Sequence, residues 1–331
     1  MKPVSNNYTR NNVGRITLGG LVVAALALAV TSVQADDDLF VSDLYGNSGV
    51  SEYTPAGNPV AQPFIPGSDL SQPFGMAISG NTMYVANMGS DTISTYDATT
   101  GAPINASFIS GVGLNQPADI LLSGDTLFVA SIGGSGPSDA NQGAVYAFNA
   151  LTGAMIGTGP LATGLDYSEY LALSGNNLYV STWDSVTEIN ATTGAIVGGG
   201  PLLTTPNARG VAVNGNDLYV VDSAEGTVTA YDATTGQKLG KPLIKGLDDL
   251  RQIQYYDGDL YVSEVGSNSI TEFNATTGCE VGTIVTGADN PYDFIITDPP
   301  GAAVPEPSTW ALLLAGGLIL FARLRKRSGK A

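Results

Sequence analysis

The chain has 331 residues, of which 30 are acidic and 13 basic, giving a formal net charge of −17. Residues 36–298 hold 29 of the acids and five of the bases, a net charge of −24, so neither nucleic acid nor an anionic lipid surface is an expected partner. Histidine is absent and cysteine occurs once, which excludes a Ser-His-Asp triad, a histidine-ligated metal site and an internal disulfide.

The first predicted segment is a signal peptide at residues 1–35. Arg10 and Arg15 precede an apolar run at 16–30, and Val33-Gln34-Ala35 places small residues at the two positions that signal peptidase reads. We therefore expect export, with cleavage by signal peptidase after Ala35. The alternative, an uncleaved membrane anchor, needs about 20 apolar residues, more than this run supplies.

Residues 36–300 are built from a repeat of about 42 residues, a length and composition typical of β-propeller blades. Each copy has a short apolar triplet followed by a turn phrase. The triplets start at Leu39, Met83, Leu127, Leu178, Leu218 and Leu260. The phrase reads YDATTG at 96–101, FNALTG at 148–153, INATTG at 189–194, YDATTG at 231–236 and FNATTG at 273–278, after a degenerate YTPAG at 53–57.

Each copy is predicted to form four strands, because β-branched and aromatic stretches alternate with turns of Gly, Asn, Asp and Pro. No stretch of 36–300 has a sustained helical period. Six inner strands are expected, starting near Phe74, Ala118, Glu169, Arg209, Arg251 and Tyr292. The domain begins at a second strand and ends at a first strand, 292–297, so we expect blade one to be closed by pairing of these two. The sequence predicts one all-β domain, a six-bladed β-propeller of four-stranded blades.

The unit at 84–101, YVAN followed by TISTYDATTG, resembles the YVTN-type propeller repeat, a relative of NHL repeats. The resemblance extends over all six units. Propellers of this type act as surface-layer and adhesion modules, and some six-bladed relatives are lactonases or lyases. The resemblance therefore implies the fold and leaves the activity open.

The predicted ligand site lies at the mouth of the central pore. Loops that lead into the inner strands meet the loops after the second strands at one face, the top face. These loops vary between copies, whereas the opposite turns are uniform, and variable loops on a fixed scaffold are where binding usually resides. The mixture of acids, arginines and aromatics suits sugar or peptide recognition. Its residues are Asp119, Glu169, Tyr170, Trp183, Arg209, Asp222, Arg251, Glu264, Tyr292 and Asp293. In the alternative interpretation, the two arginines only neutralise the acids around the channel.

Catalysis is not expected, and no catalytic residue is assigned. Six-bladed lactonases hold a divalent metal with Asn and Asp at the starts of the inner strands, where this chain carries Phe, Ala, Glu, Arg, Arg and Tyr. An extracytoplasmic metal-dependent hydrolase or lactonase is the alternative function, because a carboxylate pair among the site acids could do acid–base work. No cofactor and no metal site are predicted, although the acidic loops leave loose Ca²⁺ binding open.

Residues 301–331 form the last predicted segment. Pro305-Glu306-Pro307 is followed by Trp310, an apolar run at 311–322 and a basic cluster at 323–327. This order resembles the PEP-CTERM sorting tail of Gram-negative bacteria, which an exosortase, a membrane-embedded cysteine protease, processes at the Pro-Glu-Pro motif. The apolar run spans about 18 Å of a hydrocarbon core of about 30 Å, which favours a transient membrane helix with the basic cluster in the cytoplasm.

These segments together predict an exported protein of the cell envelope or extracellular matrix, with transient anchoring in the inner membrane. Exosortase and signal peptidase are the expected processing partners. The expected role is that of a non-catalytic binding or scaffold module, for which exopolysaccharide and envelope proteins are the candidate ligands.

Overall fold

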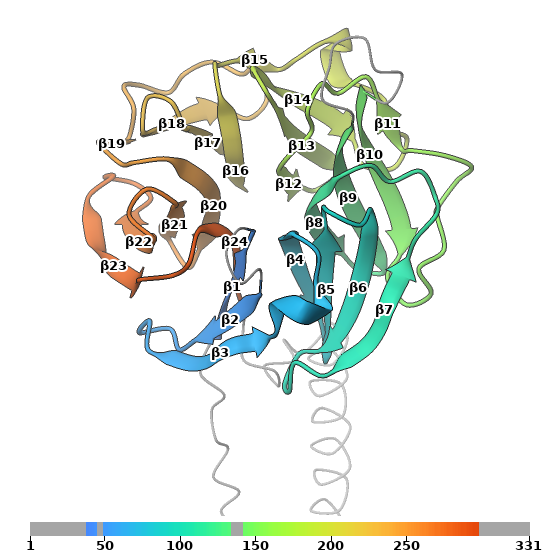
Figure 1. Cartoon of the computed structure of the whole chain (residues 1–331). Coiled ribbons are helices and arrows are strands. Elements are labelled where there is room, and N and C mark those ends of the chain that lie inside the picture. Colours follow the sequence, from blue (N-terminus) through green and yellow to red (C-terminus); the bar gives the residue numbers. More distant parts are fainter. Residues whose placement is uncertain (1–37, 45–48, 134–141, 298–331) are drawn as a thin grey trace, which may run out of the picture. The chain divides into compact units, whose positions relative to one another are not determined.

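The computed structural model describes residues 38–44, 49–133 and 142–297 (Figure 1), and the predicted signal peptide and sorting tail lie outside these ranges. The described strands form six four-stranded antiparallel sheets. The innermost strand of each sheet contacts the innermost strands of its two neighbours, so that the sheets form a ring. The prediction of an all-β, six-bladed β-propeller with four-stranded blades is confirmed. Within the same ranges, no helix has the length and apolar character needed to cross a bilayer.

The blades follow one another in chain order, and each is given from its inner to its outer strand. Blade one contains β24 (Pro291–Ile296), β1 (Leu39–Asp43), β2 (Val50–Tyr53) and β3 (Pro59–Ile65); blade two contains β4 (Pro73–Ser79), β5 (Thr82–Asn87), β6 (Thr92–Asp97) and β7 (Pro103–Ile109). Blade three contains β8 (Pro117–Ser123), β9 (Thr126–Gly133), β10 (Gln142–Asn149) and β11 (Ala162–Thr163); blade four contains β12 (Leu171–Ser174), β13 (Asn177–Thr182), β14 (Ser185–Asn190) and β15 (Leu203–Thr204). Blade five contains β16 (Ala208–Asn214), β17 (Asp217–Asp222), β18 (Thr227–Asp232) and β19 (Ile244–Lys245); blade six contains β20 (Leu250–Tyr256), β21 (Asp259–Glu264), β22 (Ser269–Asn274) and β23 (Glu280–Thr286). Two single 3₁₀ turns, η1 (Gly67–Asp69) and η2 (Val197–Gly199), complete the set.

Blade one combines strands from both ends of the domain. In the antiparallel pairing of β1 with β24, Leu39 lies opposite Ile296 and Val41 opposite Phe294. The Phe294 side chain is 1% exposed and belongs to the same apolar cluster as Leu39 and Val41. The first and last described strands therefore share one sheet and one core.

The outer strands differ between the two halves of the ring. β3, β7 and β23 have seven residues each, whereas β11, β15 and β19 have two. In blades three, four and five, which have the short outer strands, the third strand forms one isolated β-bridge with the segment that follows the repeated turn. The chain then leaves the sheet before the outer strand begins. Each departing segment contains a proline, Pro160, Pro201 or Pro242, which cannot donate to the ladder.

The repeated turn phrase has a direct structural cause, which blade two illustrates. The Asp97 carboxylate accepts the backbone N–H groups of Thr99 and Thr100, at 3.0 and 2.9 Å. Gly101 follows with φ +68°, and a Cβ there would collide with the carbonyl oxygen of Phe64 in the preceding blade. The phrase therefore both closes a turn and lets neighbouring blades approach.

The inner strands bulge near their starts, and this bulge positions the site. The register shifts between Pro117 and Ile120, and the inner strands of blades two, five and six shift at the same place. Gly75 and Gly210 stand in two of these bulges, where a Cβ would collide with the inner strand of the next blade. At the equivalent positions the other blades carry Asp119, Tyr170, Gln252 and Asp293. A bulge re-aims side chains, and here Asp119 and Asp293 reach the amides of Leu171 and Met76 in the inner strand of the next blade.

Candidate functional site

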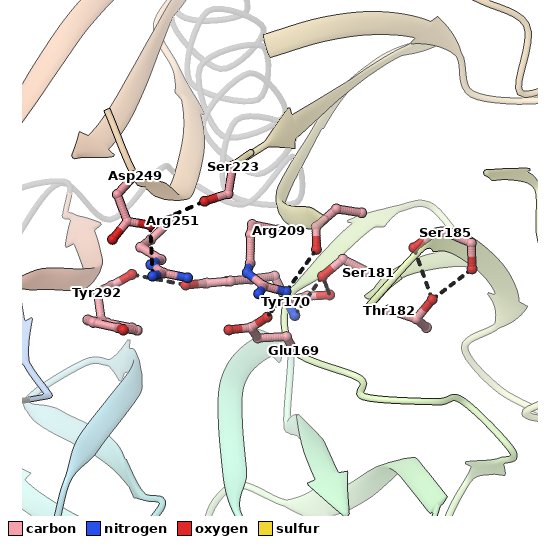
Figure 2. Close-up of polar contacts among 11 residues, drawn as sticks. Glu169, Tyr170, Ser181, Thr182, Ser185, Arg209, Ser223, Asp249, Arg251 and Tyr292 are labelled. Atoms are coloured by element: carbon pink, nitrogen blue, oxygen red, sulfur yellow. Dashed lines mark hydrogen bonds and ion pairs between the residues drawn. The ribbon is translucent and has the colours of Figure 1, made fainter. Parts of the chain in front are cut away.

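A buried ion pair lies where blades four and five meet at the top of the channel (Figure 2). Arg209 Nη1 lies 3.0 Å from Glu169 Oε2, and the two residues are 7% and 4% exposed. The guanidinium group also lies over two aromatic rings, 4.7 Å from the centroid of Trp183 and 5.8 Å from that of Tyr167. Burial raises the pKa of Glu169, and the positive charges of Arg209 and Arg251 oppose this shift.

The second arginine lies beside an aromatic cluster. Arg251 Nη2 is 2.8 Å from Asp249 Oδ1, and its guanidinium lies 4.8 Å from the ring centroid of Tyr292. The Tyr170 hydroxyl donates to the Tyr292 carbonyl oxygen at 3.1 Å (Figure 2). Phe74 packs against both tyrosine rings, with centroids 5.5 Å apart in each case.

Side chains fill the mouth of the channel. Of the six residues at the starts of the inner strands, five are buried and one, Arg251, is partly exposed. The five are Phe74, Ala118, Glu169, Arg209 and Tyr292. We name these six residues, together with Tyr170, the mouth cluster. Exposed ligand-binding groups at the top face must therefore lie around this cluster.

Below the mouth cluster the inner strands of all six blades line a cavity of 260 Å³. Two carboxylates, Asp119 and Asp293, lie in its wall. The Asp119 oxygens accept the amide N–H groups of Ile120 and Leu171, at 2.7 and 2.8 Å. Asp293 Oδ2 accepts the amide of Met76 at 2.9 Å. Asp293 Oδ1 has no partner within hydrogen-bond distance among the described residues, although the Gln252 side chain and the Phe294 amide lie near enough to the carboxyl to lower its pKa. Both carboxylates thus connect the inner strands of adjacent blades.

Burial shifts the titration of this pair. Burial raises the pKa of Asp119 to about 7, against hydrogen bonds from two amides, and the Glu169 charge adds to the rise. Burial also raises the pKa of Asp293 well above its usual range, and repulsion from Asp119 adds to that shift. In the folded protein the pair therefore resists losing both protons at neutral pH.

This predicts a specific pH dependence of stability. Because both folded pKa values are raised, ionisation disfavours the folded state above the ordinary value of 3.8, and this penalty grows as the pH rises through the folded pKa values, which is about 7 for Asp119. We expect Asp293→Asn, whose amide oxygen can still accept the Met76 N–H, to stabilise the protein at pH 8 by about 1–2 kcal/mol. At pH 4 the gain should vanish.

Denaturant unfolding at pH 4, 6 and 8 measures this difference. The matched control is Asp125→Asn in an exposed turn, where other copies of the repeat already carry asparagine. The control should not change the slope of stability against pH. An equal slope in the wild type and Asp293→Asn would show that the pair carries no ionisation penalty.

Two predicted site residues have local partners outside the mouth cluster. Asp222 accepts the backbone N–H of Glu225 at 3.0 Å, which closes the turn after β17. Glu264 accepts the hydroxyl of Thr271 at 3.0 Å, from the neighbouring strand of blade six. The structure brings together the other eight residues, namely Asp119, Glu169, Tyr170, Trp183, Arg209, Arg251, Tyr292 and Asp293.

Four residues of this site are not among the predicted site residues: Phe74, predicted only as an inner-strand start, Tyr167, Asp249 and Gln252, which lines the cavity together with Asp293. Tyr167 and Asp249 occupy the same position of the repeat, two residues before the first mouth-cluster residue of the blade. The residue at this position adopts the left-handed conformation in every blade, with φ 60° for Tyr167 and 50° for Asp249. Only side-chain placement shows that these two contact the arginines. Within the described ranges, no three His, Cys, Asp or Glu side chains are grouped so that they could hold a metal ion.

The fold and the tail define the class of the protein, an exported six-bladed β-propeller that carries a sorting motif. Residues 303–327 match the PEP-CTERM protein-sorting motif, which confirms the resemblance of the tail and implies processing by an exosortase. Residues 141–281 match the family model described as outer membrane protein assembly factor BamB. The assignment of the repeats to the YVTN or NHL type stays a prediction. No curated protein matches the chain.

The comparison with solved structures finds a chain of the same fold. A chain in the crystal structure of the nidogen/laminin complex is similar with a TM-score of 0.63 and 17% identity, over 79% of this chain and 98% of that one. The computationally designed protein Ika8 matches with a TM-score of 0.45 and 12% identity, over 79% and 81% of the two chains. At 17% identity the likeness to the nidogen/laminin chain shows the fold alone.

Proposed function

We propose that the protein is a non-catalytic binding or scaffold module of the cell envelope or extracellular matrix. The observation that carries this proposal is the filled mouth of the channel. The cavity carboxylates lie beneath the mouth cluster, so a substrate approaching from the top face meets packed side chains. A surface of this kind offers groups around its rim to a large ligand, and an exopolysaccharide or an envelope protein fits that role.

We also propose a route by which the protein reaches the envelope. The signal peptide directs export, the apolar tail helix holds the chain transiently in the inner membrane, and an exosortase then cleaves at the Pro-Glu-Pro motif. We further propose that the pairing of β24 with β1 holds the ring of the propeller closed. The high negative charge of residues 36–298 favours solubility after release.

A metal-dependent hydrolase is the rival function, and one observation favours it. Asp293 Oδ1 is a buried carboxylate oxygen without a partner within hydrogen-bond distance in the described structure, and Asp119 faces the same cavity. A divalent cation would use such oxygens as ligands and could polarise a carbonyl group there. The fit is incomplete, because both Asp119 oxygens already accept amides and no third acid joins the pair.

Metal analysis of the purified protein separates the two functions. We expect less than one tightly held divalent ion per chain after dialysis against a chelator and return to metal-containing buffer. One ion per chain that disappears in Asp293→Asn would favour the hydrolase. The Asp125→Asn variant serves as the control for a nonspecific loss of acidic charge.

The tail makes a separate prediction. From the sequence we expect Pro305 and Pro307 to favour an extended backbone around Glu306, a form that a protease can bind, and to disfavour a helix there. We expect replacement of all three by alanine to leave export intact and to block processing, so that the protein accumulates with residues 310–327 attached. Ser308→Ala is the matched control and should be processed normally.

Mass spectrometry of the protein from a host that possesses an exosortase measures the outcome. Wild-type protein carrying its full C-terminus through Ala331 would mean that the tail is a plain membrane anchor. Processing of the triple-alanine variant at the wild-type rate would mean that the motif is not the recognition element.

A further inference from the structure

Trp183 is the large aromatic side chain that the described structure leaves exposed. It stands with Asp184 in the hairpin between β13 and β14, and 43% of its surface is accessible. The other large exposed hydrophobic residues of the described ranges are aliphatic and lie in or beside outer strands and their turns; they are Val60, Ile104, Leu151, Ile156, Ile196, Val197, Leu239 and Val281. Trp183 instead borders the mouth cluster. Its place at the variable face sets it apart from the scattered apolar residues that every surface has.

The indole ring is held in position by its neighbours. Tyr167 meets it edge to face, with centroids 5.0 Å apart and an interplanar angle of 82°. The Arg209 guanidinium lies 4.7 Å from the indole centroid and is itself fixed by Glu169. The Trp183 backbone N–H donates to the Asp166 carbonyl oxygen at 3.4 Å, which ties the hairpin to the loop that carries Tyr167. An aromatic platform held in this way loses little conformational entropy on binding.

The charge around the platform selects its ligand. Asp184 follows Trp183 in the chain, and Asp166 is the residue whose carbonyl oxygen accepts the Trp183 N–H; both aspartates are exposed, and their carboxylates can accept hydrogen bonds from hydroxyl groups. Arg209 is nearly buried and paired, so its charge does not reach an anionic group outside. An anionic polymer would meet these acids and the negative surface around them, and it would be repelled.

We propose that Trp183, Tyr167, Asp166 and Asp184 form a subsite for a neutral saccharide. The C–H face of a sugar ring stacks on the indole, and its hydroxyl groups donate to the two carboxylates. This inference rests on the proposed binding function and names its ligand class.

Tryptophan fluorescence tests the subsite in the full chain. Trp183 and Trp310 are the two tryptophans, so a Trp310→Phe background, excited at a wavelength that tyrosine does not absorb, leaves Trp183 as the sole emitting tryptophan. The probes are the neutral hexasaccharides of β-1,4-, β-1,3- and α-1,4-linked glucose, and an oligogalacturonate hexamer as the anionic probe. We expect at least one neutral probe to shift the Trp183 emission to shorter wavelength in a saturable way, and the anionic probe to cause no shift.

Calorimetry with the same neutral probe then compares variants in the otherwise unchanged chain. We expect Trp183→Ala to weaken binding at least tenfold, and Asp166→Asn combined with Asp184→Asn to weaken it severalfold. Leu151→Ala removes an exposed apolar side chain from a turn that faces away from the site, and it should bind as the wild type does. Thermal unfolding verifies that each variant is folded.

Any of three outcomes would overturn the inference: no emission shift with any neutral probe, binding by Trp183→Ala as tight as by the wild type, or tighter binding of the oligogalacturonate than of the neutral probes. These outcomes can be distinguished from a failure of the proposed function. If the wild type and Trp183→Ala are retained equally on the host's own matrix, the subsite is wrong and the binding module stands. If neither is retained on any matrix or envelope fraction, the proposed function fails.

Discussion

Deletion of residues 292–297 is expected to leave an insoluble or open protein. The deletion removes nearly all of β24, and with it the ladder to β1 and the buried side chain of Phe294. It also removes the Asp293 carboxylate that binds the Met76 amide of blade two, and the Ile296 amide that donates to Gln254 of blade six at 3.1 Å. The combined loss approaches the whole stability of a typical domain, about 5–15 kcal/mol.

Size-exclusion chromatography and thermal unfolding measure this result. The control is a deletion of equal length directly after the strand, residues 298–303, which should leave the melting temperature within a few degrees of the wild type. A monomeric 292–297 deletion with unchanged melting would show that β24 does not close the ring. The exposed edge of β1 would otherwise pair with other chains, so aggregation is the expected consequence.

Removal of one partner of the buried ion pair is the second large effect. Glu169→Gln leaves the Arg209 charge in a buried site without its carboxylate, and we expect a loss of about 3–5 kcal/mol in the free energy of unfolding. The matched control is Asp249→Asn, which weakens the partly exposed pair with Arg251 and should cost about 1 kcal/mol or less.

A double replacement separates lost charge pairing from lost packing. Glu169→Leu combined with Arg209→Met removes both charges and keeps apolar volume, so it should recover most of the stability lost in Glu169→Gln. Urea unfolding of the four proteins gives the comparison. If Glu169→Gln costs no more than Asp249→Asn, then the Glu169–Arg209 pair is effectively hydrated and the mouth of the channel is open to water.

The repeat made the architecture predictable because its residues act locally. The Asp97 carboxylate closes its own turn, Gly101 takes its left-handed conformation there, and each copy repeats this chemistry. The outer strands of blades three to five were predicted less well. In blade four the chain leaves the ladder after a single bridge at Ile196 and rejoins it only at β15, and the alternation of apolar residues alone does not show where an outer strand ends.

The site was predictable only as a set of positions. The copies placed Glu169, Arg209 and Arg251 at equivalent strand starts, which brings them to one mouth. Which acid each arginine would contact was not predictable, since Arg251 pairs with Asp249 of its own loop. Such pairings depend on side-chain directions that the bulges set, and a bulge leaves a weak trace in the sequence.

Co-sedimentation of the purified, processed protein with exopolysaccharide and envelope fractions of its own host tests whether the propeller is a non-catalytic binding module. We expect saturable retention on one of these fractions, unchanged by a chelator and without any chemical change in the retained material. Protein that stays in the supernatant with every fraction, or that releases cleaved products in a metal-dependent way, would show that it is not.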